Sequence, residues 1–261
     1  MSGKACLLFI ILPIISPSAV YAVQEVIRVG ADLTNPPFQS KDKNGYPSGF
    51  DIDVTNALCR SINARCDYVV NTFDAQIPSL LSRKTDIILP LGATEKRRNS
   101  IDFSHYVFHD PTRLVTRKNS HLLPRADMLK GKSIAVLQGS IQEIYANKYW
   151  LSAGVEVKNY QDQDAIYQDL YTGRVDGALC PSAELIAGFL QTPEGKNFEL
   201  KGPEITDTEL FSIGSAYGIR KNDIKTKQLI NRGLDNIMND GTYSVIEKKY
   251  FGDLNISIKG K

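Results

Sequence analysis

A segment of the chain recurs 90 positions further along, and this repeat limits the folds that the chain can adopt. Asp74 in the first copy matches Asp164 in the second, and Asp86 matches Asp176. In both copies a helical pattern precedes the second aspartate, which opens a short apolar segment typical of a buried strand. Two units that each alternate strand and helix favour parallel strands in an α/β fold.

Each unit also starts with an apolar strand, formed by residues 27–31 in the first unit and 133–137 in the second. The spacing of Ser140 and Glu143 predicts a capping box at the start of the helix that follows the second of these strands. Open α/β sheets bind ligands beyond the carboxyl ends of their strands. We therefore expect a ligand cleft between the two units.

Residues 86–104 carry the strongest indication of a binding site. Residues 86–89 are expected to form a strand that stops before residues 90–92, because the proline and glycine there suit a central strand poorly. Thr94 is the expected N-cap of a short helix that carries Arg97 at its third position. An arginine at a helix start can hold an anionic carboxylate through two N–H groups. The alternative is a capped surface helix with Arg97 in solvent.

Residues 1–22 have the features of a secretory signal peptide. Lys4 precedes an apolar run that is too short to span a membrane, and cleavage is expected after Ala22. Removing Lys4 leaves 30 basic and 29 acidic residues, a net charge of +1. This balance argues against a dedicated nucleic-acid-binding protein, which would carry a concentrated basic excess.

The mature chain would keep three cysteines, Cys59, Cys66 and Cys180. In an exported protein, two of them are expected to pair. Cys59 and Cys66 can close a small loop, whereas Cys180 is distant in the sequence and is expected to be a buried, small apolar side chain. The alternative is three buried thiols.

Residues 49–54, followed by Leu58, Cys59 and Ile62, resemble the signature of the family 3 periplasmic solute-binding proteins. The likeness covers nearly the whole mature chain and extends to the polar amino-acid binders through residues 73–80, 137–140, 145–147, 188–190, 240–243 and 249–251. Within the family, the chain is most similar to the lysine/arginine/ornithine-binding and histidine-binding proteins. The Cys59 and Cys66 pair lies where that subgroup has its disulfide.

The resemblance implies the type II periplasmic-binding-protein fold, an α/β fold with two lobes. Each lobe would be a mixed sheet flanked by helices, and two crossing strands, near Asp110 and Leu210, would form the hinge. The first lobe is expected to comprise residues 23–109 and 211–261, and the second residues 112–207. We expect two helices over residues 224–250, broken at Asp240 and Gly241 and packed on the first lobe, and a loose tail after residue 254.

The implied function is capture in the periplasm of a polar, cationic amino acid or amino-acid derivative and its delivery to an inner-membrane ABC permease. The resemblance implies a monomer with no cofactor, no metal, no catalytic residue and no nucleic-acid partner. In the family, the position of Arg97 holds the ligand carboxylate, Asp32 meets the cationic end, and Phe73 forms a wall along the aliphatic stem. Asp32 has an alternative role in an Asx-turn before the prolines that follow it. The expected ligand-binding residues are Asp32, Asn35, Phe73, Gly92, Arg97, Leu137, Ser140, Ile141, Gln142 and Pro181.

Several of these positions depart from the family pattern. Asn35 replaces an aromatic residue and Ile141 replaces a hydroxyl residue, and Leu89, Pro90 and Gly92 stand where the family has serines around the strand end. Pro181 stands where the family has a carboxylate for the ligand α-amino group, and a buried ammonium without a partner is costly. We therefore hypothesise a ligand whose α-nitrogen is substituted, as in opines, or absent, unless Glu184 or water replaces the lost carboxylate.

Two other functions are compatible with the sequence. One is a secreted dehydratase of the same fold acting on prephenate-like acids, for which Asp32 and Glu184 are the candidate acid or base groups. None of the three histidines is expected near the pocket. The other is a degenerate or sensor-docking interaction protein.

Overall fold

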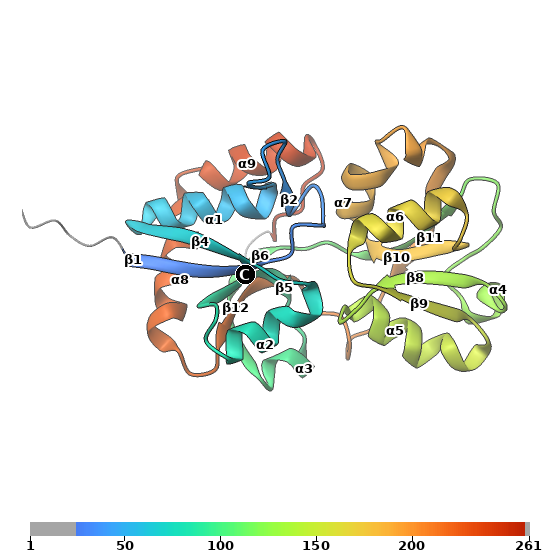
Figure 1. Ribbon diagram of the computed structural model, residues 1–261, viewed down its shortest axis with the longest axis horizontal. Coiled ribbons are helices and arrows are strands. Elements are labelled where there is room, and N and C mark those ends of the chain that lie inside the picture. Colours follow the sequence, from blue (N-terminus) through green and yellow to red (C-terminus); the bar gives the residue numbers. More distant parts are fainter. Residues whose placement is uncertain (1–24, 259–261) are drawn as a thin grey trace, which may run out of the picture.

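The computed structural model describes residues 25–258 as two lobes that lie side by side, each built on a five-stranded sheet (Figure 1). The expected signal peptide, residues 1–22, and its cleavage site lie outside this range. Within residues 25–258, no helix combines the length and the apolar character needed to cross a bilayer.

The sheet of the first lobe has the strand order β4-β1-β5-β12-β6. Its strands are β1 (Glu25–Ala31), β4 (Ala64–Val70), β5 (Ile87–Gly92), β6 (Ile101–Phe108) and β12 (Ser215–Arg220). The β1 strand pairs in parallel with β4 and β5, whereas β12 runs antiparallel to β5 and β6. The flanking helices are α1 (Phe50–Ser61), α2 (Gln76–Leu81), α3 (Glu95–Arg98), α8 (Ile224–Asn239) and α9 (Thr242–Phe251).

Alternating side chains of β5 bury against two different cores, as a strand buried on both faces requires. Ile87 and Leu89 join the core shared with α1, α8 and α9, while Ile88 joins the core on the α2 side. Leu91 also joins the core on the α2 side, because the register shift against β12 interrupts the alternation after Ile88. A small hairpin of β2 (Ser40–Lys41) and β3 (Pro47–Ser48) precedes α1.

The sheet of the second lobe has the order β11-β7-β10-β8-β9. Its strands are β7 (Thr112–Arg117), β8 (Ser133–Leu137), β9 (Glu156–Tyr160), β10 (Gly177–Pro181) and β11 (Phe198–Ile205). The helices are α4 (Ala126–Leu129), α5 (Ile141–Tyr149), α6 (Gln163–Thr172) and α7 (Ser182–Leu185), the last continuing into a π-helical turn, Ile186–Leu190. Short 3₁₀ turns occur at Phe73–Ala75, Leu151–Ala153 and Glu194–Asn197.

The chain crosses between the sheets through residues 109–111 and 206–214, so the first sheet is completed by a strand that follows the whole second lobe. The predicted α/β fold with two mixed sheets is therefore confirmed. The two crossing segments, expected as strands, lie outside the assigned strands.

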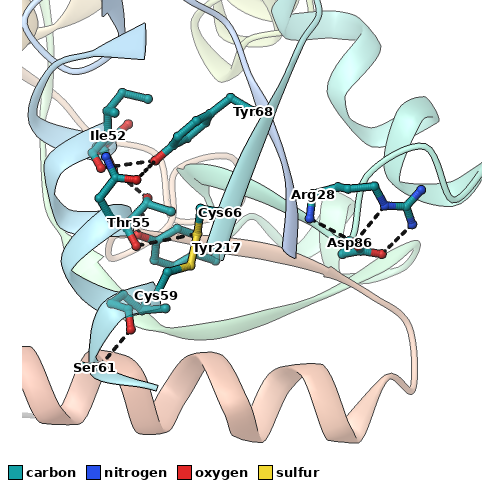
Figure 2. Close-up of a disulfide and its surroundings, with 12 residues drawn as sticks. Arg28, Ile52, Thr55, Cys59, Ser61, Cys66, Tyr68, Asp86 and Tyr217 are labelled. Atoms are coloured by element: carbon teal, nitrogen blue, oxygen red, sulfur yellow. Dashed lines mark hydrogen bonds and ion pairs between the residues drawn. A yellow bond between two sulfur atoms is a disulfide. The ribbon is translucent and has the colours of Figure 1, made fainter. Parts of the chain in front are cut away.

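The two repeat copies have the same structural role. The carboxylate of Asp86 accepts a hydrogen bond from the Arg28 backbone N–H at 3.0 Å, and that of Asp176 accepts one from the Ser133 N–H at 2.9 Å. Each aspartate thus joins the start of its strand to the strand that opens its repeat unit, β1 in the first lobe and β8 in the second. Figure 2 shows the hydrogen bonds that Arg28 donates to the Asp86 carboxylate. Burial raises the pKa of Asp86, but the hydrogen bonds and charge of Arg28 outweigh it and lower the pKa overall.

The expected end of a strand at residue 89 is wrong, since β5 continues through Pro90 to Gly92. The ladder between β5 and β12 is irregular at this point, because its register shifts between Ala216 and Gly218. Proline is tolerated at such a bulge, where its missing N–H is not needed for the ladder.

The predicted disulfide between Cys59 of α1 and Cys66 of β4 is present (Figure 2). Cys180 is a free, buried cysteine, as predicted. Beside the disulfide, the hydroxyl groups of Thr55 and Tyr217 lie 2.8 Å apart and hydrogen-bond to each other. The disulfide therefore fixes α1 to the sheet at a buried, hydrogen-bonded position.

Alkylation of the mature protein should modify one thiol when it is unfolded without a reductant, and three thiols after reduction. The disulfide protects Cys59 and Cys66, while unfolding exposes Cys180. Intact mass spectrometry counts the added groups. Three modified thiols without reductant would contradict the disulfide.

The C-terminal segment differs from the expected loose tail. The break between α8 and α9 lies at Asp240 and Gly241 as predicted, but Ile256 is only 4% exposed. Its carbonyl accepts a hydrogen bond from the His109 N–H at 2.8 Å, and its N–H donates to Glu247 Oε1 at 2.9 Å. Residues 255–258 thus dock on the first lobe beside the crossing segment.

Candidate functional site

A cavity lies between the two lobes, and all ten predicted ligand-binding residues line it. The first lobe contributes Asp32, Asn35, Phe73, Gly92 and Arg97, and the second contributes Leu137, Ser140, Ile141, Gln142 and Pro181. Their positions follow from the fold, because they stand at or just beyond the carboxyl ends of β1, β4, β5, β8 and β10.

One end of the cavity is formed by Arg97. Thr94 caps α3 as predicted, its hydroxyl accepting a hydrogen bond from the Arg97 N–H at 3.2 Å. The guanidinium donates to the carbonyl of Gly92 at 2.9 Å and to that of Gly139, in the second lobe, at 3.1 Å. It also lies over the ring of Phe73, 5.4 Å from the centroid. Arg97 therefore points into the cleft instead of standing in solvent.

Arg97 has no carboxylate partner among residues 25–258. Burial alone lowers its pKa to about 10, which leaves the guanidinium charged at neutral pH. Arg97 is partly buried, and a partly buried cation without a counter-charge would gain free energy from a ligand anion.

The predicted capping box at Ser140 forms only in part. The Ser140 hydroxyl accepts a hydrogen bond from the Glu143 N–H at 3.1 Å. The Glu143 carboxylate, however, accepts from the N–H of Gly139 at 2.6 Å and not from that of Ser140. The amide of Gln142 donates to Thr112 Oγ1 at 2.8 Å, so this side chain ties the start of α5 to β7.

The space beside Gly92 is filled by a residue from the opposite lobe. A Cβ atom built on Gly92 would lie 2.5 Å from Ile141 Cδ1 and 3.6 Å from Arg97 Nη1. Glycine at this position therefore makes room for Ile141 of the second lobe.

The other end of the cavity is acidic. Asp32, Asp51, Asp110 and Glu184 all line it, and none of them forms an ion pair within the described part of the chain. Burial raises the pKa of Asp32 and of Asp110 to about 6, and burial together with the charge of Asp110 raises that of Glu184 to about 8. Asp32 also accepts the Thr34 hydroxyl at 2.8 Å, so it takes part in the local turn as well as lining the cavity.

The acidic end offers more hydrogen-bond acceptors than donors. The buried atoms Asn35 Oδ1 and Asp51 Oδ1 have no hydrogen-bond partner within residues 25–258. The side-chain amide of Gln39 accepts a hydrogen bond from the Asp32 backbone N–H and donates one to Asp51 Oδ2, each at 2.9 Å. These two bonds occupy the amide oxygen and one amide hydrogen of Gln39. Because buried acceptors are stabilised by donors, this end suits a cationic group that carries several N–H bonds.

Sequence reasoning missed several residues of the cavity. Asp51 and Asp110 were not singled out as ligand groups, although Asp51 belongs to the family signature and Asp110 was placed at a lobe crossing. His109 also lines the cavity, so the expectation that no histidine lies near the pocket is wrong. The sequence offered one indication of this: His109 directly precedes Asp110, which is expected at the crossing between the lobes.

The lobes also meet beside the cavity. Gln138 Nε2 donates to Asp74 Oδ2 across the cleft at 2.7 Å. Gly188 stands so close to the backbone of Pro36 that a side chain at this position would clash. The structure therefore shows the lobes in contact around the cavity.

Residues 27–253 match the family described as bacterial extracellular solute-binding proteins, family 3. The chain belongs to this family.

The chain is 41% identical over 246 residues to the histidine-binding periplasmic protein of Escherichia coli (strain K12), covering 94% of this chain and 95% of that protein. It is 43% identical over 240 residues to the lysine/arginine/ornithine-binding periplasmic protein of the same strain, covering 92% of each. Among solved structures, an ancestral arginine-binding protein bound to arginine superposes with a TM-score of 0.80 and 32% identity, covering 88% of this chain and 99% of that one. The resemblance inferred from the sequence is thus confirmed.

Proposed function

We propose that this chain captures a cationic amino acid or amino-acid derivative in the periplasm and delivers it to an inner-membrane ABC permease. The family and the names of the relatives support a binding protein for amino acids. The observation that carries the proposal is the polarity of the cavity, with the unpaired Arg97 at one end and buried carboxyl groups at the other. A zwitterionic ligand with a distant cation matches both ends.

In this proposal, Arg97 binds the ligand carboxylate and Asp32 binds the cationic end. Phe73 keeps the guanidinium of Arg97 in place through its ring and faces the ligand stem. Contact of the lobes around the cavity excludes water, which strengthens the interactions of both charges with the ligand. The cleaved signal peptide ending at Ala22 would direct the chain to the periplasm.

The finer proposal concerns the ligand α-nitrogen. Pro181 lines the cavity from the end of β10, and its ring carries no hydrogen-bond acceptor. Pro181, more than Gly92, therefore disfavours a free α-ammonium group. We propose a ligand whose α-nitrogen is substituted or absent.

Calorimetric titration with free arginine, octopine and nopaline should rank the two opines above arginine. The opines keep a carboxylate for Arg97 and a guanidinium for Asp32, and their α-nitrogen is substituted. A thermal-shift panel that includes lysine, ornithine and histidine gives an independent check, since a ligand at a hundredfold excess over its Kd adds about 2.7 kcal/mol of stability. Submicromolar binding of free arginine without binding of either opine would contradict the finer proposal and leave the transport function intact.

A second candidate function is favoured by one observation, the buried Glu184 carboxyl group. With its pKa raised to about 8, this group holds a proton at neutral pH, as a general acid must. In a dehydratase acting on prephenate, it would protonate the leaving hydroxyl group, which departs as water while the ring carboxylate leaves as carbon dioxide. Formation of phenylpyruvate from prephenate, lost in Glu184→Gln, would favour the enzyme over the binding protein.

A further inference from the structure

Glu184 lies in the second lobe and borders the acidic end of the cavity. It belongs to α7, directly after β10, and is only 4% exposed. Its backbone N–H and that of Ala183 donate to the Asp110 carboxylate at 3.3 and 2.7 Å, which holds the start of α7 against the crossing segment. Its side chain is thereby placed on the cavity wall.

The Glu184 carboxyl group has no counter-charge, and the hydrogen bonds of Tyr167 and Asn35 lower its pKa by less than burial raises it. The Tyr167 hydroxyl donates to Oε1 at 3.3 Å, which is long for a hydrogen bond between two oxygens. Within residues 25–258, no lysine, arginine or histidine forms an ion pair with it. The nearby acidic groups, Asp110 and Asp32, oppose its ionisation further.

We propose that Glu184 is a specificity-determining residue that meets the ligand's cation from the second lobe, opposite Asp32 of the first, and releases a proton to solvent when the cation enters. The proposal deepens the proposed function and rests on it. Each ligand bound would convert one neutral carboxylic acid into a carboxylate paired with the cation. Ligand capture would then be linked to pH.

The groups around Glu184 define the pH range of this linkage. Tyr167 of α6 and Cys180 of β10 have pKa values raised well above their ordinary range by burial, so neither ionises near neutral pH. Asp110 and Asp32 have pKa values near 6 and are already ionised at pH 7. Glu184, whose pKa is about 8 without ligand, is then mostly protonated at pH 7 and must lose its proton as the cation binds. Affinity is therefore expected to rise with pH up to about 8 and to level off above it.

The test is calorimetric titration of the full mature chain with L-arginine and with octopine, between pH 6.5 and 8.5. At pH 7, in buffers of different ionisation enthalpy, the wild-type protein should release close to one proton per ligand. Its affinity should rise by about tenfold per pH unit below the pKa of Glu184. Glu184→Gln keeps the shape of the side chain and should abolish the proton release, with an affinity at pH 8 lower by about thirtyfold or more. The exposed Glu194→Gln in the same lobe is the matched control, expected to behave as wild type.

Two outcomes would overturn the proposal while leaving the proposed function in place. Ligand binding without proton release, with an affinity of Glu184→Gln within threefold of wild type, would show that Glu184 does not meet the cation. Proton release that persists in Glu184→Gln and disappears in His109→Gln would assign the titration to His109, which lines the same cavity. Absence of binding by arginine, lysine, ornithine, histidine and octopine to the wild-type chain would overturn the proposed function and this proposal together.

Discussion

Replacing Arg97 with alanine is expected to lower ligand affinity by about thirtyfold to several thousandfold. Arg97 is the cation at its end of the cavity, and its guanidinium already spans both lobes through the carbonyls of Gly92 and Gly139. Truncating one side of a buried, hydrogen-bonded charge pair typically costs about 2–5 kcal/mol, much of it from leaving the other charge unpaired. Isothermal titration calorimetry measures the change directly.

Two further variants make the Arg97 result specific. Lys96→Ala removes an exposed cation from the same short helix and should leave affinity unchanged. Arg97→Lys keeps the charge but loses the planar pair of N–H donors, so its affinity should lie between those of wild type and Arg97→Ala. A change below threefold in Arg97→Ala, with the fold intact by circular dichroism, would show that the ligand carboxylate binds elsewhere.

Replacing Asp32 with asparagine should weaken the binding of cationic ligands by about 2–5 kcal/mol. Asp32 is 6% exposed and lines the acidic end of the cavity, where no lysine or arginine of residues 25–258 pairs with it. Asparagine preserves the size of the side chain and can still accept the Thr34 hydroxyl, so the local turn should survive. The loss would therefore report the charge of Asp32.

The sharpest measurement for Asp32 is discrimination between arginine and citrulline, its neutral analogue of similar shape. The wild-type protein should prefer arginine, and Asp32→Asn should lose most of that preference. Asp253→Asn, which removes an exposed carboxylate from the same lobe, provides the control. An unchanged preference in Asp32→Asn would show that Asp32 acts only in its local turn with Thr34 and does not bind the cationic end of the ligand.

Much of the candidate site could be read from the sequence, because its signals are local or repeat at a fixed spacing. The cap that Thr94 makes to Arg97 spans three residues, so spacing alone indicates it. Asp86 and Asp176 could be matched because each stands at the start of an equivalent strand. The pairing of Cys59 with Cys66 was likewise readable from their short separation and the family likeness.

The features that sequence reasoning missed depend on contacts between distant segments. Pro90 stays in β5 because the bulge against β12, more than 120 positions later, removes the need for its N–H. Ile256 docks because Glu247 and His109 supply the partners of its backbone. Neither partner can be inferred from the local sequence around Pro90 or Ile256.

The sequence by itself determined the two repeated units, their strands and caps, the disulfide and the family. Only the tertiary structure decided that Ile141 fills the space beside Gly92 and that Asp51 and Asp110 join Asp32 and Glu184 around one cavity. The physical reason is that a carboxyl group's burial and charge environment depend on which segments fold against it. In this chain those segments come from both lobes and from the crossing between them.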